Sequence, residues 1–320
     1  MTWASTNPSS TFRSTDPCPP LRRGRTRLLV NPAAGGGRAD RLQPWVAAQL
    51  QRAFGDVDAV HTTSFQNADE ALAEFAATDG EGDRVVVMGG DGMVHLGLNH
   101  LAGTRIRLAI VPSGTGNDFA SSVGLPSRVD DAIRHIVADQ PTRIDLAEVT
   151  GAVYGGHCWV GCVVSTGYDA IVNRRTNRMT TKFGPLSYGW VALSALAEFT
   201  PRHYRISIDG QDRELDAMLI AVGNGGHFGG GMRVCPTASV VDGLLDITII
   251  HAVSRRALLS CLPLLYAGRF THLDFVETLR ARRVDIDGDD MFAMADGEEI
   301  GDVPLTVVAR SSAVNLVGLP

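Results

Sequence analysis

Three glycine-rich turns hold the residues best suited to bind a phosphate. They occupy Asn31–Gly37, Gly89–Gly92 and Pro112–Asp118, and each follows a short apolar segment. Glycine lets a backbone approach a phosphate closely and direct its N–H groups toward it, and a following helix adds a positive dipole end. The need for a tight turn is enough to explain the glycines of one of these segments, but it is a weaker explanation for all three. Three glycine-rich turns, each placed after an apolar segment, therefore favour a nucleotide-binding site.

Lysine, a common cationic partner of nucleotide phosphates, is nearly absent. Among the 29 Lys+Arg residues only Lys182 is lysine, and it lies outside every glycine turn. A G-x-x-x-x-G-K-[ST] phosphate loop is therefore excluded, as is the lysine that pairs with phosphates in protein kinases. A nucleotide bound at these turns would have to be held without a lysine charge.

Acidic residues beside glycines are the second set of candidates. Asp91 either meets phosphates through Mg²⁺, which prefers carboxylate and phosphate oxygens, or caps the helix that follows. Glu298, after Asp296 and Gly297, either projects into a cleft or belongs to a hairpin turn with exposed acids. Asp242 precedes a glycine and reads as a turn before a strand.

The elements that position the turns alternate between strand and helix. Apolar strands are predicted at 27–30, 57–62, 84–88 and 107–111, and helices at 42–50, 68–77 and 94–101. Short apolar strands separated by helices indicate a parallel sheet with helices on its faces. Ligands of such sheets bind at the carboxyl ends of the strands, where the three turns lie.

The second half alternates with period two and has frequent turn signals, which predicts an antiparallel sandwich or barrel. Helices are expected at 185–199 and 255–267 and a strand at 304–319. We expect a disordered tail at 1–23, an α/β domain at 24–145 completed by a strand at about 304–320, and a β-rich domain at 146–303.

Composition narrows the class of protein. The 320 residues carry a net charge of -6, which argues against a protein that coats nucleic acid. The five cysteines include no C-x-x-C pair, which argues against a disulfide framework. The expected location of the protein is therefore the reducing cytoplasm. The N-terminus lacks the apolar core of a signal peptide, and no apolar run reaches the ~20 residues of a membrane span.

Two motifs carry a family resemblance. The turn at 89–92 reads G-G-D-G and the segment 112–120 reads P-S-G-T-G-N-D-F-A; D-G-E follows at 296–298. Together they resemble the diacylglycerol kinase catalytic-domain family over about residues 25–320. The resemblance implies a two-domain, ATP- and Mg²⁺-dependent kinase whose acceptor is a lipid hydroxyl, with diacylglycerol first among the candidates. The ATP-binding domain would be 24–145 with the strand at about 304–320, and the lipid-acceptor domain would be 146–303.

The resemblance also implies roles for individual residues. Glu298 would be the general base, with Asp91 linked to Mg²⁺. A structural Mg²⁺ would bind Asp242 and carbonyl groups near Ser239 and Leu244. The residues implied in nucleotide binding are Asn31, Thr62, Gly89, Gly90, Asp91, Gly92, Met93, Thr115, Gly116 and Asn117.

The chain departs from the family pattern after the GGDG turn. The family usually has threonine, then an Asn-Glu pair, where this chain has Met93, His95 and Leu96. These changes keep two alternatives open. One is an NAD kinase, which shares GGDG, and the other is a nucleotide-binding regulator that has lost catalysis.

The expected partner is a lipid alcohol presented by a membrane, through transient peripheral contact at its inner face. Arginines cluster at 22–27, 174–178 and 280–283. These clusters are candidates for contact with anionic lipid headgroups, and the alternative is that they form a solvated charged face.

Overall fold

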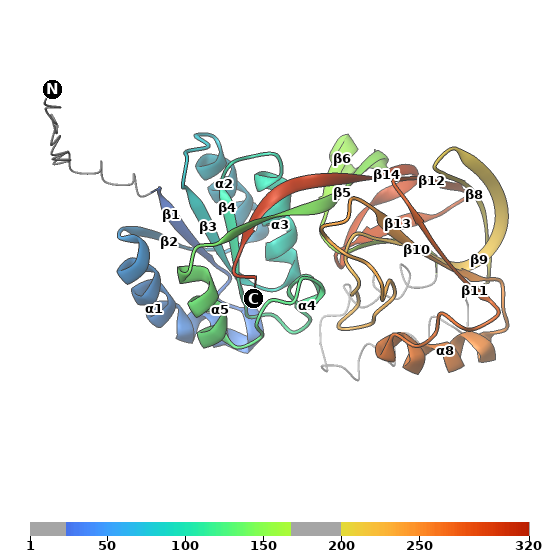
Figure 1. The fold of residues 1–320 in the computed structure, drawn as a ribbon, viewed down its shortest axis with the longest axis horizontal. Coiled ribbons are helices and arrows are strands. Elements are labelled where there is room, and N and C mark those ends of the chain that lie inside the picture. The colour runs from blue at the N-terminus through green and yellow to red at the C-terminus, as the bar shows by residue number, and fades with distance from the viewer. Residues whose placement is uncertain (1–23, 168–199, 320) are drawn as a thin grey trace, which may run out of the picture.

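The structure is a computed structural model that describes residues 24–167 and 200–319. Four sequence predictions fall outside the described residues: the tail at 1–23, the helix at 185–199, the arginine cluster at 174–178, and Lys182. The described chain forms two units joined by long strands (Figure 1).

The N-terminal unit is a parallel sheet with helices on its faces. Its strands lie in the order β4-β3-β1-β2, and the pairs within it are parallel. β3 is buried along its whole length because the sheet is covered on both faces. The elements are β1 (Thr26–Val30), α1 (Ala34–Phe54), β2 (Val57–His61), α2 (Phe65–Ala76), β3 (Arg84–Gly89), α3 (Asp91–Leu101), β4 (Arg107–Pro112), α4 (Asp118–Ser122) and α5 (Val129–Val137).

The C-terminal unit is built from antiparallel pairs. Its elements are β5 (Pro141–Val153), the 3-10 helix η1 (Tyr154–Gly156), β6 (His157–Val160), β7 (Val163–Gly167), β8 (Arg202–Ile208), β9 (Gln211–Gly223), β10 (Leu245–His251), α8 (Arg255–Ala267), β11 (Val276–Ala281), β12 (Arg283–Gly288), β13 (Phe292–Ala295) and β14 (Glu298–Val317). The predicted fold class, α/β followed by an antiparallel β unit, is confirmed. The helix predicted at 255–267 coincides with α8.

Two long strands tie the units together. β14 begins in the antiparallel unit, and its residues Asn315–Val317 pair in parallel with Arg107–Ala109 of β4. β5 runs beside β14 over most of its length (Figure 1). The strand that starts at Glu298 therefore ends inside the parallel sheet of the N-terminal unit. This continuity sets the position of Glu298 relative to that sheet.

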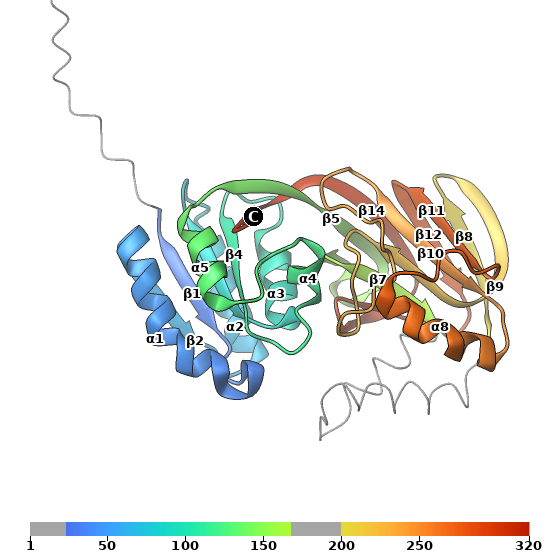
Figure 2. The same ribbon diagram turned by 60° about the horizontal axis from the view of Figure 1, so that its bottom comes forward.

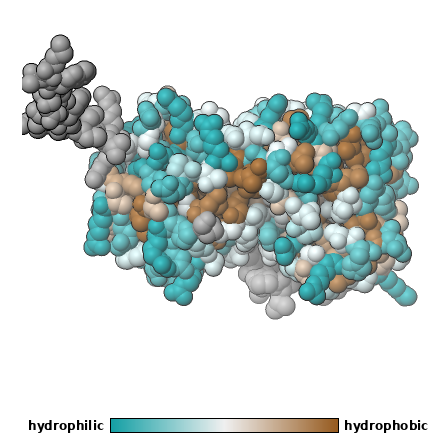
Figure 3. Space-filling view, viewed as in Figure 1, coloured by the Kyte–Doolittle hydropathy of each residue, from teal (hydrophilic) through white to brown (hydrophobic). Residues whose placement is uncertain are grey.

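The hydrophobic core continues across the junction. One buried cluster contains Leu98 and Leu108 of the first unit together with Cys162 and Leu219 of the second. On the face shown in Figure 3, apolar residues form patches among hydrophilic ones. Among the described helices, none is long and apolar enough to cross a lipid bilayer.

Candidate active site between the two units

The three glycine turns meet at the carboxyl edge of the parallel sheet. A Cβ added to Gly114 would lie 2.5 Å from Cα of Gly90, and one added to Gly35 would lie 2.6 Å from the carbonyl oxygen of Ser113. A side chain at either glycine would therefore push two turns apart. The amides of Ser113 and Gly114 both donate to the carbonyl oxygen of Gly89, at 2.9 and 3.2 Å.

Asp91 is the first residue of α3 and faces the next turn. Its Oδ1 accepts the N–H of Phe119 at 3.2 Å, and a Cβ on Gly116 would lie 2.8 Å from its Oδ2. Burial and the negative charge of Asp118 raise the pKa of Asp91 to about 6. Asp91 thus bonds to the start of α4, in addition to standing at the start of its own helix.

Glu298 reaches this site from the other unit. Asp296 and Gly297 form a two-residue hairpin between β13 and β14, with φ of 49° and 89°. The hairpin turn weighed from the sequence is therefore present. The hairpin places the Glu298 side chain beside the turn at Gly89–Gly92, because a Cβ on Gly92 would lie 3.2 Å from Glu298 Oε1.

Asp296 holds this hairpin in place from within. Its side chain is only 6% exposed. One oxygen accepts the N–H of Cys162 at 2.8 Å, and the other accepts the N–H of Gly161 at 2.8 Å and faces His95 Nδ1 at 3.1 Å. A carboxylate that accepts several hydrogen bonds is held in one orientation, so the backbone that carries Glu298 is firmly positioned.

His95 lies on α3 and supplies the contact between helix and hairpin. Burial opposes its protonation, but hydrogen bonds to Asp296 and Cys158 and the charge of Asp296 outweigh this and raise the pKa of His95 to about 10. At neutral pH His95 is therefore a cation that donates to Asp296. One turn further along α3, the side-chain amide of Asn99 binds the backbone of Trp159 on β6. Its Oδ1 accepts the N–H of Trp159 at 2.8 Å, and its Nδ2 donates to the carbonyl of Trp159 at 2.9 Å.

A second contact between the units comes from α4. The carboxylate of Asp118 accepts the N–H groups of Gly230 and Gly231, at 2.8 and 2.7 Å. Ser122 Oγ accepts the N–H of His227 at 3.1 Å. Burial raises the pKa of Asp118, while the two backbone donors oppose that rise. The loop 227–231 is thereby held against the turn that begins at Pro112.

The implied nucleotide-binding residues fall into two groups. Gly90, Gly92, Thr115 and Gly116 lie at the meeting point of the turns, with Thr115 exposed. The amide of Asn117 caps its own turn by bonding Gly114 N–H and carbonyl, each at 3.0 Å.

Three further implied residues support the turns from beneath. Thr62 is buried and its hydroxyl donates to the carbonyl of Val30 at 3.0 Å. Asn31 accepts the N–H of Ala33 through Oδ1 at 3.1 Å. Met93 packs against Gly89 in the core, and its N–H donates to Gly90. Its side chain and amide are thus both already engaged.

The implied structural Mg²⁺ does not fit its residues. Asp242 Oδ1 accepts the N–H of Leu244 at 3.0 Å, and Oδ2 pairs with the guanidinium of Arg280. Arg280 also reaches Asp246, at 3.2 Å. The arginine thus supplies the positive charge that a cation at Asp242 and Ser239 would bring. Among the described residues, no cluster of three His, Cys, Asp or Glu side chains is arranged for a metal ion.

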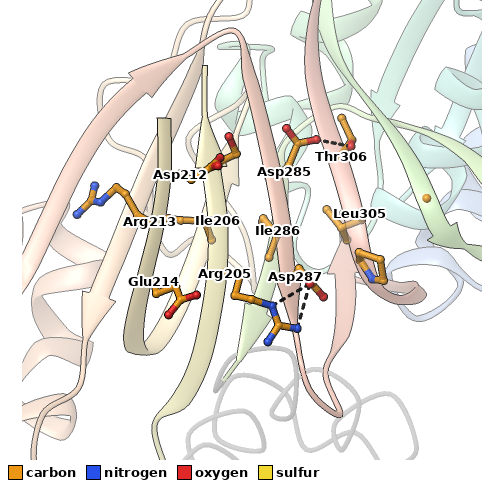
Figure 4. Close-up of a pocket in the computed structure, with 13 residues that line it drawn as sticks. Arg205, Ile206, Asp212, Arg213, Glu214, Asp285, Ile286, Asp287, Leu305 and Thr306 are labelled. Carbon is orange, nitrogen blue, oxygen red and sulfur yellow. Dashed lines mark hydrogen bonds and ion pairs between the residues drawn. The ribbon is translucent and has the colours of Figure 1, made fainter. Parts of the chain in front are cut away.

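A separate hollow of about 580 Å³ lies on the outer face of the β-rich unit (Figure 4). It is lined from β5, β8, β9, β12 and β14, and none of the implied site residues borders it. Several of its charged groups are engaged within the chain: Arg205 bonds Asp287 at 3.0 Å, and Asp285 pairs with Arg283 at 2.6 Å. It is therefore not the candidate active site.

The sequence prediction gives no role to Asp118, Asp296 or His95. Asp118 and Asp296 belong to the motifs at 112–120 and 296–298, and their position after a predicted strand or turn is an available signal. His95 stands out in the sequence only as a departure from the family pattern. Its partner Asp296 lies 201 positions away in the sequence, so no local pattern pairs them.

Comparisons with known proteins agree with this architecture. Residues 25–149 match the model of the diacylglycerol kinase catalytic domain, and residues 162–318 match the YegS C-terminal NAD kinase beta sandwich-like domain. A crystal structure from Bacillus anthracis, described as a diacylglycerol kinase, superposes with a TM-score of 0.77 at 26% identity and covers 92% of this chain and 95% of that one.

Curated relatives extend the likeness over nearly the whole chain. A diacylglycerol kinase of Mycobacterium tuberculosis is 36% identical over 302 residues, which are 93% of this chain and 97% of that protein. A protein of Stenotrophomonas maltophilia described as a YegS-like lipid kinase is 30% identical over 81% of this chain and 83% of its own. Matches of this identity and coverage, on a fold with both units in place, show that the chain belongs to the diacylglycerol kinase catalytic-domain family and is a lipid kinase.

Proposed function

We propose that this lipid kinase transfers the γ-phosphoryl group of ATP, with Mg²⁺, to the hydroxyl group of diacylglycerol or a closely related lipid alcohol. The observation that carries the proposal is the approach of Glu298 Oε1 to Gly92, where a Cβ would lie 3.2 Å away. A carboxylate from the β-rich unit thereby stands beside the turn that would hold the phosphates. A hydroxyl group between them would meet both a base and a phosphoryl donor.

In the proposed reaction the lipid oxygen bonds to the γ-phosphorus while the bond from that phosphorus to the ADP oxygen breaks. Glu298 accepts the hydroxyl proton, and the products are ADP and a lipid phosphate monoester. The hairpin fixed by Asp296 would hold Glu298 in line with the acceptor. Catalysis in such a transfer is mainly positioning and electrostatic stabilisation, which a rigid carboxylate and converging turns supply.

The residues present fit Mg²⁺ that arrives with ATP. Asp91 is buried at the start of α3, and the negative charge of Asp118 is a cause of its raised pKa. A cation beside Asp91 would relieve this crowding of negative charge, since carboxylate and phosphate oxygens are its preferred ligands. When bound, Mg²⁺ neutralises phosphate charge. The turn amides and the α3 N-terminus would complete the phosphate contacts without a lysine.

The test is Glu298→Gln, with Glu299→Gln as the matched control. Glu299 is the next residue and accepts the hydroxyl of Tyr154 at 2.9 Å, so its change tests the general effect of removing one acid there. We expect Glu298→Gln to lower kcat for diacylglycerol by roughly 10²- to 10⁴-fold, the range for loss of a general base. ATP affinity, measured by calorimetry, should stay near that of the unchanged chain. Equal activity of the two variants would exclude Glu298 as the base.

The same purified protein separates the two alternatives. Incubation with NAD and ATP tests an NAD kinase, because phosphorylated NAD would appear. A nucleotide-binding regulator would bind ATP and phosphorylate neither NAD nor any lipid alcohol in a mixed-micelle screen. We expect turnover with the lipid alcohol alone.

A further inference from the structure

Helix α8 presents an unusual combination of charge and apolar surface. The segment from His251 to Leu273 contains Arg255, Arg256 and Arg269 and no aspartate or glutamate, whereas the whole chain has a net charge of -6. All three arginines are exposed. Among the described residues, none forms an ion pair with them.

Most described arginines of the clusters noted in the sequence differ in this respect, Arg282 being the exception. Arg25 pairs with Asp83, and Arg27 pairs with Asp58 and Glu74. Arg280 pairs with Asp242 and Asp246, and Arg283 pairs with Asp285. These guanidinium groups are already neutralised within the chain. The arginines of α8 keep their charge available for an external anion.

Helix α8 also has one buried apolar side and one exposed side. One face is buried in the core through Leu258, Cys261 and Leu265. Tyr266, which is 47% exposed, lies outside this buried stripe, whereas half-buried Leu259, two helical turns earlier, packs against the same core. Arginines beside an exposed tyrosine are typical of a surface that lies at a membrane interface.

The helix borders the candidate active site. The loop from Gly230 to Arg233 links α4 to the C-terminal turn of α8, because the N–H groups of Gly230 and Gly231 donate to Asp118 of α4. The N–H of Arg233 donates to the carbonyl of Leu265 at 2.9 Å, so the exposed Arg233 lies beside the same turn. α8 lies on the side of the β-rich unit that faces forward in Figure 2, below α4 in both views.

We propose that α8 is the surface by which the protein docks on an anionic lipid bilayer, with Arg255, Arg256, Arg233 and Arg269 facing lipid phosphates and Tyr266 entering the interface. This rests on the proposed function, because docking here would bring a bilayer-held lipid alcohol to the site between the units. The net negative charge of the chain makes a specific basic face necessary, since the remaining surface would be repelled by anionic headgroups.

The test is binding to sedimented vesicles of phosphatidylcholine alone and of phosphatidylcholine with about 30 mol % phosphatidylglycerol. The variant is Arg255→Glu with Arg256→Glu. Glutamate in the first turn of a helix favours its dipole, so α8 should stay folded. The matched control is Arg41→Glu with Arg52→Glu on α1, where both residues are exposed and the change in net charge is the same.

We expect the unchanged chain and the control to bind the anionic vesicles, and the α8 variant to bind them about 30-fold less tightly. Salt at about 0.5 M should remove most of this difference. Tyr266→Ser should weaken binding to both kinds of vesicle. Equal binding by the α8 variant and the control overturns the proposal, as does failure of the unchanged chain to bind anionic vesicles.

A soluble acceptor separates this proposal from the proposed function. A short-chain diacylglycerol, dissolved without vesicles, should be phosphorylated equally by the unchanged chain and the α8 variant. If neither phosphorylates it while α8 still directs vesicle binding, the proposed acceptor is wrong and the docking surface stands. If both phosphorylate it and vesicle binding is insensitive to α8, the docking surface is wrong and the kinase reaction stands.

Discussion

His95 occupies the place where the family pattern has asparagine, and the structure gives it a partner. Its ring meets Asp296 at 3.1 Å, with side chains 12% and 6% exposed. Asp296 in turn orients the hairpin that begins β14. A charged pair buried at this depth is costly to break, because removing one partner leaves the other charge without compensation. We therefore interpret the departure at His95 as a change in how the hairpin is held.

The His95–Asp296 pair predicts a pH dependence of stability. The pKa of His95 is raised in the folded state, to about 10, above its ordinary value of 6.5. Its stabilising contribution is therefore complete below pH 6.5 and is lost as the pH rises toward 10. His95→Asn should lower the free energy of unfolding at pH 6, by about 3 kcal/mol, and the gap to the unchanged chain should narrow by pH 10.

Urea denaturation at several pH values measures this gap. The control is His100→Asn on the same helix, because His100 meets Asp69 at 2.7 Å in a more exposed pair, 21% and 47% exposed. A surface pair of this kind contributes about 0–1 kcal/mol. A gap for His95→Asn that is the same at pH 6 and pH 10 would contradict the assignment of a protonated histidine.

At the scale of elements, the turn after β4 is shaped by the turn after β3. A Cβ on Gly114 would lie 2.5 Å from Cα of Gly90, a backbone atom that cannot move without shifting the start of α3. The two strands are paired in register up to Gly89 and Pro112, so their ends cannot separate freely. The close approach of the turns after β3 and β4 is thus a consequence of the pairing of these strands and of glycine at positions 90 and 114.

Gly114→Ala should accordingly disturb both stability and nucleotide binding. Overpacking of this kind costs about 1–3 kcal/mol, and we expect ATP affinity, measured by calorimetry, to fall by tenfold or more. Gly97→Ala is the matched control, because its Cβ would meet Leu108 and Val87 side chains at an ordinary 3.4 Å and alanine favours a helix. If both variants bind ATP like the unchanged chain, the convergence of the turns is not what forms the site.

At the scale of the whole molecule, the site exists because the units are held together at several points. Asp118 reaches from α4 to the backbone of Gly230 and Gly231, and Asn99 reaches from α3 to Trp159. β14 adds a continuous strand through both units. Loss of one contact should therefore loosen the junction without unfolding either sheet.

Asp118→Ala tests the α4 contact. Two backbone donors lose their acceptor, at a cost of about 1–3 kcal/mol in the free energy of unfolding. Hydrogen exchange of the amides in 228–232 should accelerate, while that of β3 should not. Asp131→Ala on α5 is the control, since Asp131 pairs only with the exposed Arg128 and Arg134 of its own helix region. Unchanged exchange in 228–232 would show that Asp118 does not hold this loop.

Local patterns predicted much of the fold. Apolar runs bounded by glycine located β1, β3 and β4, and the period of the apolar residues located α8. These elements follow from steric preference and from burial of one face, which neighbouring residues decide. α5 and the long β5 were not predicted as such, because their amphipathic patterns are short or interrupted by polar residues.

The order of a parallel and then an antiparallel unit, the glycine turns and the family motifs can all be read from local sequence. The approach of Glu298 to Gly92, the contact of His95 with Asp296 and the pairing of Arg280 with Asp242 are visible only in the folded chain. Turns and strands depend on nearby residues, whereas these contacts depend on the register of β14 and on a shared core, which join residues far apart in the chain.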